Sequence, residues 1–283
     1  MCMRKLVKLS IRILVKSKFI SSIYLRVNNF FLATKYKELE SSNLIDLAKL
    51  LSPSPFPVNL LERVGNESDG GYVIYNNIDI KTQIMSLGVG HDISFEKGME
   101  SRVLGTQFFD HTVHDLPIKI KNSQFNGLKI SELNEKNSVS LNALLSKIDS
   151  DYLILKIDIE GQEWDSFLQI GEEQLLKCTQ IVGEFHNFHR IYNRAFYEKI
   201  NICLRKILKT HVLINSHANN WGGYIIVHGV PLPDVFELTF LRKNLYGDIE
   251  VKTKNFISDH SSTTHLNKPN NPNRPEIKLS FFH

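Results

Sequence analysis

The sequence contains little cysteine and no long apolar run. Its 283 residues include three cysteines, at positions 2, 178 and 203, with no Cys-x-x-Cys pair. This pattern excludes a disulfide framework and a four-cysteine zinc site, and it suits a reducing compartment. Charged residues interrupt Met1–Lys37 too often for a membrane-spanning helix, which needs roughly 20 apolar residues. They also interrupt the apolar stretch that a secretory signal requires, so we expect a cytoplasmic protein.

Acidic residues are absent from Met1–Lys37, which holds nine lysines and arginines. Because the formal net charge is +4, the remaining 246 residues carry a net charge of −5, and no nucleic-acid partner is expected. Four basic residues form one narrow stripe on a helical wheel, opposite an aliphatic side: Lys5, Lys8, Arg12 and Lys16. Residues 1–33 are therefore predicted either to bind an anionic surface at the inner face of the membrane or to pack on the domain or a second subunit.

Proline separates this extension from the rest of the chain. A helical pattern runs from Lys35 to Leu51, and three prolines between residues 53 and 57 end it, because proline lacks the amide donor. We therefore expect a basic amphipathic helical extension at residues 1–51 and one domain at residues 58–283. Prolines at three-residue spacing near the end predict an extended surface tail over residues 255–274.

Short apolar or β-branched runs alternate with helical patterns after residue 71. Strands that are apolar on both faces and separated by helices predict a doubly wound, mainly parallel α/β sheet. No strong helix follows residue 209, so the sheet is expected to end in antiparallel strands. The expected strands are 72–75, 84–87, 107–109, 152–157, 180–185, 211–215, 224–227 and 235–241, and the expected helices are 94–104, 140–148, 163–177 and 192–208.

Two candidate cofactor elements follow consecutive expected strands. Gly88 and Gly90, with Asp92 after them, form a Gly-x-Gly turn that lets the backbone approach a ligand closely. Asp110 ends the next strand about 20 residues later, where a carboxylate can accept hydrogen bonds from both ribose hydroxyls of a nucleoside cofactor. As alternatives, the glycines only turn the chain, Asp92 caps a helix, and Asp110 caps a loop or pairs with a lysine.

The strongest local signal is the segment 154–165, ILKIDIEGQEWD, in which an apolar strand delivers four carboxylates within eight residues. Asp158 could face the cofactor or take a proton from a substrate hydroxyl, and Glu160 could bind substrate or a cation. The two later acids suit the first turn of a helix. His186 follows the next strand and is a candidate general base, with Asp158 as second choice. A divalent metal on these residues is possible, but no spacing demands one.

A further polar group follows the strand expected at 211–215. His217, Asn220 and Trp221 are expected on a loop at the same rim of the sheet. Such a loop could bind a sugar, with Trp221 stacked on its apolar face. The alternative is a Gly-Gly hairpin turn with a packed tryptophan.

Taken in order, several segments resemble the FkbM-type S-adenosylmethionine-dependent methyltransferases, in the branch with a DGGY segment. They are DGGYV at 69–73, SLGVG at 86–90, FDHTV at 109–113, LKIDIEG at 155–161 and EFH at 184–186. The resemblance covers roughly residues 60–230, with residues 270–281 as a family tail. It implies a class I methyltransferase sheet, a cofactor cradled by Gly88 and Gly90, its ribose held by Asp110 and its methionine end near Asp158.

The resemblance also implies an activity, namely methyl transfer from S-adenosylmethionine to a hydroxyl of a saccharide in surface-polysaccharide or glycan biosynthesis. Two departures from the general class I pattern stand at Ser86, where an acid is common, and at Asp92, where a third glycine is common. Two alternatives stay open. One is a nicotinamide-dependent oxidoreductase, since a Gly-x-Gly turn with a spaced acid also serves that cofactor. The other is a non-catalytic, membrane-docked scaffold that keeps the fold.

Overall fold

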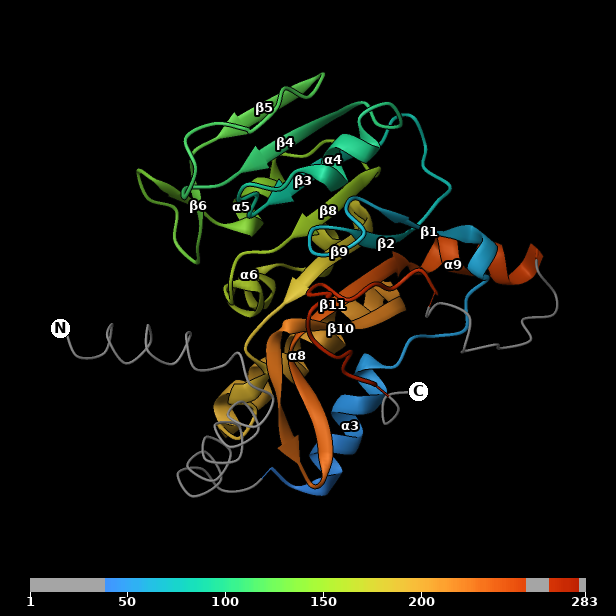
Figure 1. Ribbon diagram of the computed structural model, residues 1–283. Coiled ribbons are helices and arrows are strands. Elements are labelled where there is room, and N and C mark those ends of the chain that lie inside the picture. Colours follow the sequence, from blue (N-terminus) through green and yellow to red (C-terminus); the bar gives the residue numbers. More distant parts are fainter. Residues whose placement is uncertain (1–38, 253–264, 280–283) are drawn as a thin grey trace.

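The computed structural model describes residues 39–252 and 265–279 (Figure 1). At its centre is a seven-stranded sheet with the strand order β10-β11-β9-β8-β3-β4-β5. Strands β9, β8, β3, β4 and β5 are parallel, and β11 runs antiparallel to both β9 and β10. The strands span Gln83–Leu87 (β3), Gly105–Phe109 (β4), Ser123–Asn126 (β5), Leu153–Ile157 (β8), Cys178–Phe185 (β9), His211–Val227 (β10) and Val230–Arg242 (β11).

The order of the strands positions the ligand crevice. The chain enters the sheet at β3, moves outward through β4 and β5, and then crosses to β8 on the other side of β3. The direction of strand addition therefore reverses beside β3, and ligands of such sheets bind beyond the carboxyl ends of the strands at this point. The predicted doubly wound, mainly parallel sheet with antiparallel final strands is confirmed.

The two faces of the sheet have different covers. Leu155 of β8 points into the main core on one face, whereas its neighbour Ile154 points to the other. Helices cover the main core: α3 (Ser41–Leu51), α5 (Leu141–Ser146), α6 (Glu163–Gln169), α7 (Glu172–Leu176) and α8 (Arg194–Thr210). The opposite face is covered by α4 (Ser94–Met99), by α9 (Lys243–Lys252) and by a separate two-stranded sheet of β1 (Leu61–Val64) and β2 (Tyr72–Tyr75). The remaining elements are short: η1 (Val58–Leu60), β6 (Lys129–Ile130), β7 (Ser138–Val139) and η2 (Phe188–Arg190).

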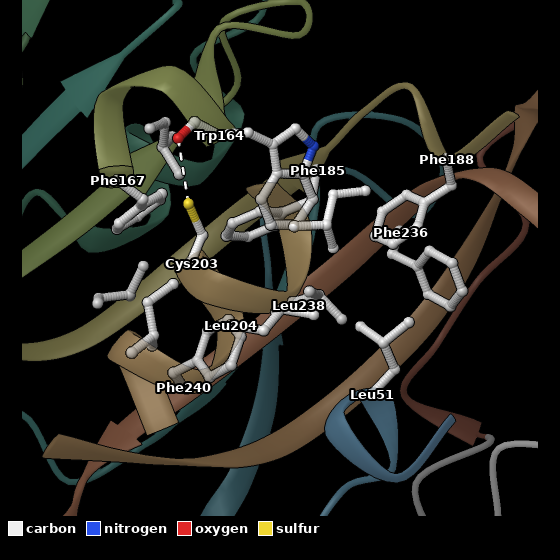
Figure 2. Packing of buried hydrophobic residues seen from close by; sticks show 14 of the residues in the cluster. Leu51, Trp164, Phe167, Phe185, Phe188, Cys203, Leu204, Phe236, Leu238 and Phe240 are labelled. Atoms are coloured by element: carbon white, nitrogen blue, oxygen red, sulfur yellow. Dashed lines mark hydrogen bonds between the residues drawn. The ribbon is translucent and has the colours of Figure 1, made fainter. Parts of the chain in front are cut away.

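Figure 2 shows how aromatic rings of the main core pack between α6, β9 and β11. The fully buried ring of Trp164 lies 5.3 Å from the ring of Phe185 and 5.4 Å from that of Phe188, measured between centroids. Cys203 of α8 closes the cluster, with its thiol 3.2 Å from the main-chain oxygen of Trp164. The indole N–H of Trp164 donates to the main-chain oxygen of His186 at 2.8 Å. The core therefore fixes the turn that carries His186.

Several boundaries differ from the predictions. The helix expected at 163–177 is two helices, because Gly171 between them is extended, with φ −88° and ψ 174°. The helix expected at 94–104 already ends at Met99. The strand expected at 72–75 exists but pairs only with β1 instead of joining the main sheet.

The helix predicted before the prolines is present as α3, whose buried side chains Leu44, Leu47 and Leu51 join the main core. The basic amphipathic segment predicted at residues 1–33 lies outside the described residues. Within residues 39–252 and 265–279, no helix is both long and apolar enough to cross a bilayer.

Candidate functional site

The carboxyl end of β3 turns at Gly88 and Gly90, both of which have positive φ angles, +74° and +58°. A Cβ at Gly88 would collide with the main-chain oxygen of Asp158 on the neighbouring strand, so this close approach requires glycine. At Gly90, in contrast, no heavy atom of the described residues lies within 4 Å of the position of a Cβ. Lys156 of β8 supports the turn, because its buried Nζ donates to the main-chain oxygen of Gly88 at 2.6 Å.

Asp110, at the end of β4, is bound to the glycine turn. Its Oδ2 accepts the main-chain N–H groups of Val89 and Gly90, both at 2.8 Å, and its Oδ1 accepts the N–H and the hydroxyl of Thr112, both at 2.6 Å. Burial alone would raise the pKa of Asp110, but these hydrogen bonds lower it to about 2. The four usual acceptor positions of the carboxylate are occupied, so a ligand hydroxyl must replace one donor. The Thr112 hydroxyl is the replaceable one, because it can rotate away.

A cavity of about 220 Å³ lies between the glycine turn and Asp110. Its wall combines the main chain of the turn and three carboxylates with apolar side chains, including Phe109, Leu128, Ile130 and Ile159. Asp92, predicted to belong to this site, does not line the cavity. Its carboxylate accepts the main-chain N–H of Ser94 at 2.8 Å and a hydrogen bond from Asn66, which corresponds to the capping alternative.

The carboxyl ends of β8 and β9 bring His186 among four carboxylates, and we call these five residues the His186 cluster: Asp158, Glu160, Glu163, Glu184 and His186. The Nδ1 of His186 lies 3.1 Å from Oε1 of Glu163, a fully buried residue at the start of α6. Its Nε2 faces the other three carboxylates, 3.8 Å from Asp158 Oδ1, 3.8 Å from Glu160 Oε2 and 3.6 Å from Glu184 Oε2. The sheet thus brings together Asp158, Glu160 and His186, the three residues of the cluster that the sequence suggested for the site.

The electrostatics of the cluster favour Asp158 over His186 as the base, which is the reverse of the order expected from the sequence. Burial raises the pKa of Asp158 although Lys156 and His186 oppose it, and burial with neighbouring carboxylates raises that of Glu184 far more. Burial would lower the pKa of His186, but the hydrogen bond and the charge of Glu163 help to raise it to about 9. An imidazole with that pKa is protonated at neutral pH and accepts no further proton. Asp158 therefore suits the role of base better than His186.

A second cavity, of about 430 Å³, opens beside the cluster. His186, Glu184 and Glu160 line it, together with Asp69, Asn187, Asn219, Trp221, Gly222, Asp234 and Val235. Glu160 also lines the smaller cavity, as does Asp158, whose carboxylate faces His186. The two cavities therefore meet at the turn after β8.

The loop predicted for residues 217–224 is wrong, because these residues belong to strand β10. The chain turns later, at His228 and Gly229, whose φ angles of +48° and +81° suit a two-residue hairpin. His217 is buried within the strand pair, with Nδ1 2.9 Å from Glu237 Oε2 and Nε2 3.4 Å from Glu276 Oε2. Its ring nitrogens are thus engaged within the protein and do not line the larger cavity.

The other two residues predicted to bind a sugar, Asn220 and Trp221, contact the tail near the end of the chain. Asn220 is buried and donates to the main-chain oxygen of Asn271 at 2.9 Å, so it anchors the tail. Trp221 does line the larger cavity and is half exposed, with the Arg274 guanidinium 5.4 Å from the ring centroid. Asn270 of the tail is buried as well, contrary to the expected surface position, and donates to Asp69 Oδ1 at 3.1 Å. The tail therefore forms part of the support of the cavity.

The sequence assigned no part in the site to two residues of the cluster, Glu163 and Glu184. Glu163 was expected only to offset a helix dipole, but it accepts the main-chain N–H groups of Ile159 and Gly161 and orients His186. Glu184 had a readable signal, because side chains two residues apart near a strand end point to the same face, as Glu184 and His186 do.

A comparison with known protein families identifies the family of the chain that carries this site. Residues 66–206, about half of the chain, match the methyltransferase FkbM domain. The chain belongs to the FkbM methyltransferase family. The matched region contains the glycine turn, Asp110 and the whole His186 cluster. In this FkbM protein the seven-stranded sheet is the class I methyltransferase sheet that the resemblance implied.

Similarity of the FkbM chain to solved structures is low. An rRNA methylase from Streptococcus thermophilus has a TM-score of 0.36 and 8% identity, covering 58% of this chain and 89% of that one. A fibrillarin/Nop5p complex has a TM-score of 0.36 and 9% identity, with 58% and 74% covered. Spermidine synthase from Thermotoga maritima has a TM-score of 0.33 and 10% identity, with 77% and 76% covered. Among curated proteins, none matches this FkbM sequence.

An FkbM methyltransferase implies S-adenosylmethionine as methyl donor, and the smaller cavity fits this cofactor. The open space at Gly90 is a cradle that any side chain would fill. Apolar side chains such as Leu128 and Ile130 offer a surface for an aromatic base, and Asp110 offers an ionised carboxylate. At the other end of the same cavity, the Asp158 side chain supplies negative charge where a sulfonium needs it.

Proposed function

We propose that this FkbM methyltransferase transfers a methyl group from S-adenosylmethionine to a hydroxyl oxygen of a saccharide, in the biosynthesis of a surface polysaccharide or another glycan. One observation carries the proposal, namely that the smaller cavity beside the glycine turn and the larger polar cavity meet at the turn after β8, where Asp158 and Glu160 stand. A donor and an acceptor bound in the two cavities would face each other at this turn.

On the donor side, three groups hold the cofactor. Gly88 and Gly90 have no side chains, so the ligand can approach the main chain of the turn closely. Asp110 binds the ribose when a ribose hydroxyl takes the place of the Thr112 hydroxyl. Asp158 lies at the methionine end, where its charge favours the sulfonium.

On the acceptor side, the larger cavity suits an uncharged polyol. Trp221 presents a half-exposed ring on which the apolar face of a sugar can stack, and the carboxylates of Asp69 and Asp234 can accept hydrogen bonds from its hydroxyls. The same carboxylates, with Glu160, repel phosphate groups. The cavity therefore favours a saccharide over a nucleic-acid backbone.

The chain has two tasks in the reaction. When bound, S-adenosylmethionine supplies a methyl carbon whose bond to sulfur breaks, with its electron pair left on sulfur, as the bond to the acceptor oxygen forms. The cavities align the acceptor oxygen with this carbon, a contribution of up to ~7–11 kcal/mol. Asp158 accepts the hydroxyl proton, which typically contributes about 10²–10⁴-fold in rate.

Calorimetry with S-adenosylhomocysteine tests the donor site. Asp110→Asn keeps the shape but removes the charge, so it should weaken binding at least tenfold, equal to about 1.4 kcal/mol. Thr112→Val removes the hydroxyl that must leave, so its affinity should equal or exceed that of the unchanged protein. Equal binding by Asp110→Asn would remove the ribose role from Asp110.

A screen with labelled S-adenosylmethionine tests the acceptor. Uncharged oligosaccharides are compared with an RNA pool of equal hydroxyl concentration, and label is expected on the oligosaccharides. Label on RNA alone would refute the saccharide proposal while leaving methyl transfer intact.

A further inference from the structure

We propose that Asp158, Glu184 and His186 form a divalent-cation site at the meeting point of the two cavities. The inference deepens the proposed function, since it concerns the same pocket, but it stands on the arrangement of the side chains rather than on the reaction. The chemistry of the three groups is one imidazole and two carboxylates, which suits ions such as Mn²⁺ and Zn²⁺.

The distances within the cluster are those of ligands around an ion. One ligand atom from each of the three residues lies within 4.8 Å of the other two. The Nε2 of His186 is 3.8 Å from Asp158 Oδ1 and 3.6 Å from Glu184 Oε2, too far for hydrogen bonds. Two ligand atoms at such separations, each about 2.1–2.2 Å from one ion, subtend roughly 110–130° at the ion.

The imidazole is oriented as in metal sites. Ligating histidines commonly donate their second ring N–H to a carboxylate, which fixes the tautomer and turns the free lone pair to the metal. Here the Nδ1 of His186 faces Glu163 Oε1 at 3.1 Å. Glu163 itself is fully buried and held by two main-chain N–H groups, so it orients the ring firmly. The Nε2 atom thereby faces Asp158 and Glu184, where a bound ion would take the place of the Nε2 proton, which is released on binding.

Glu184 provides an independent indication. Its side chain is more than nine-tenths buried and points into the larger cavity, yet no described residue forms a hydrogen bond with its carboxylate. A buried carboxylate without such partners is costly in a protein. A cation bound between Asp158 and Glu184 would engage one oxygen of each carboxylate and leave the second oxygen of Asp158 for the hydroxyl proton.

The cavity leaves room for further ligands. Glu160 Oε2 also lies 3.8 Å from Nε2 of His186, and its side chain is 89% exposed, so it can move toward or away from an ion. Water or an acceptor oxygen could occupy the remaining positions, because Glu160, Glu184 and His186 line the cavity proposed for the acceptor. An ion there would lower the pKa of a coordinated hydroxyl.

Binding of Mn²⁺ to the full chain, without cofactor or acceptor, tests the inference. Paramagnetic resonance counts free Mn²⁺, and calorimetry measures the affinity after treatment with a chelator. One ion per chain is expected, with Zn²⁺ competing for the same site. Absence of saturable binding of Mn²⁺ and of Zn²⁺ at millimolar concentration would overturn the proposal.

Two variants distinguish ligation from a general effect of charge. Glu184→Gln removes a ligand and should weaken Mn²⁺ binding at least tenfold. Asp234→Asn removes one negative charge from the same cavity without removing a ligand, and it should change the affinity less than threefold. Equal losses in both variants would mean that the ion is only attracted by the net charge, and would overturn the site.

Stability measurements guard against misfolding. Without metal, Glu184→Gln should unfold at the same temperature as the unchanged protein or higher, because it removes a buried repulsion. With Mn²⁺, the unchanged protein should gain thermal stability and the variant should not. Binding of S-adenosylhomocysteine is measured separately, in the presence of chelator. If the protein binds Mn²⁺ but not S-adenosylhomocysteine, the proposed function is refuted and the cation site stands.

Discussion

Substituting the two glycines of the turn by alanine should separate cofactor binding from folding. Gly88 and Gly90 are two residues apart and both have positive φ angles, but their surroundings differ. A Cβ at Gly88 meets the main chain of β8, whereas a Cβ at Gly90 meets open space on the wall of the smaller cavity. Gly90→Ala should therefore impair the cofactor site, and Gly88→Ala should impair the fold.

The magnitudes follow from the local contacts. An alanine in the left-handed region costs about 1–2 kcal/mol, and the loss of unfolded-state freedom returns ~0.4–1 kcal/mol, so Gly90→Ala should lower the free energy of unfolding by about 1 kcal/mol. Gly88→Ala adds overpacking of ~1–3 kcal/mol. It also strains the main-chain hydrogen bonds from Gly88 N to Phe109 O and from Asp158 N to Leu87 O, each worth ~0.5–1.5 kcal/mol. The sum, roughly 3–7 kcal/mol, is a large part of a typical total stability.

Gly229→Ala provides a matched control. Gly229 also has a positive φ, +81°, and open space at its Cβ position, but it lies at the hairpin between β10 and β11. Urea unfolding should show similar small losses for Gly90→Ala and Gly229→Ala. Calorimetry with S-adenosylhomocysteine should show at least tenfold weaker binding for Gly90→Ala and unchanged binding for Gly229→Ala. Unchanged binding by Gly90→Ala would refute the cradle.

Three further predictions concern other parts of the chain. Burial lowers the pKa of His211 to about 4. Between pH 6.5 and pH 4 the unfolded state therefore binds a proton on His211 that the folded state does not, and the free energy of unfolding falls by about 3 kcal/mol. Urea unfolding over this pH range should show a smaller fall for His211→Gln. Burial raises the pKa values of Cys178 and Cys203 to about 12, so both should resist a thiol reagent at pH 8 until urea unfolds the protein, and labelling of either one in the folded protein would contradict the structure. Changing Lys5, Lys8, Arg12 and Lys16 to glutamine should weaken binding to anionic vesicles, measured by cosedimentation, by about 4 kcal/mol. An unchanged affinity would favour the packing alternative for residues 1–33.

The parallel strands at the centre were predictable because they are buried on both faces. Segments such as Leu153–Ile157 are almost wholly apolar, and the polar residues that follow them then stand out. This pattern located Asp110, Asp158 and His186 at strand ends, where the structure places them. The edge strand Ser123–Asn126 and the strand Leu61–Val64 escaped notice, because they are short and carry polar residues that are also common in loops.

Contacts between distant segments could not be predicted. The tail residue Asn270 binds Asp69, which is 201 positions away in the sequence, and no local pattern signals this pair. The same holds for Trp164, whose indole donates to the main chain of His186 across 22 positions. Residues 217–224 were expected in a loop because of their glycines and asparagines, but they belong to β10, and four of them pair with β11. Tertiary pairing outweighs local propensity in such strands.

The His186 cluster is better explained by function than by folding. Burial raises the pKa of Asp158 and of Glu184, which means that the folded state disfavours their charged forms. Such carboxyl groups destabilise the protein at pH values above their unfolded pKa and do so less as the pH falls through their folded pKa. A chain selected for stability alone would place apolar residues there. The rigid aromatic core beneath, joined to His186 through Trp164, offsets this cost and holds the charges in one geometry. Carboxyl groups that cost stability, held on a rigid support at the point where two cavities meet, are typical of functional sites.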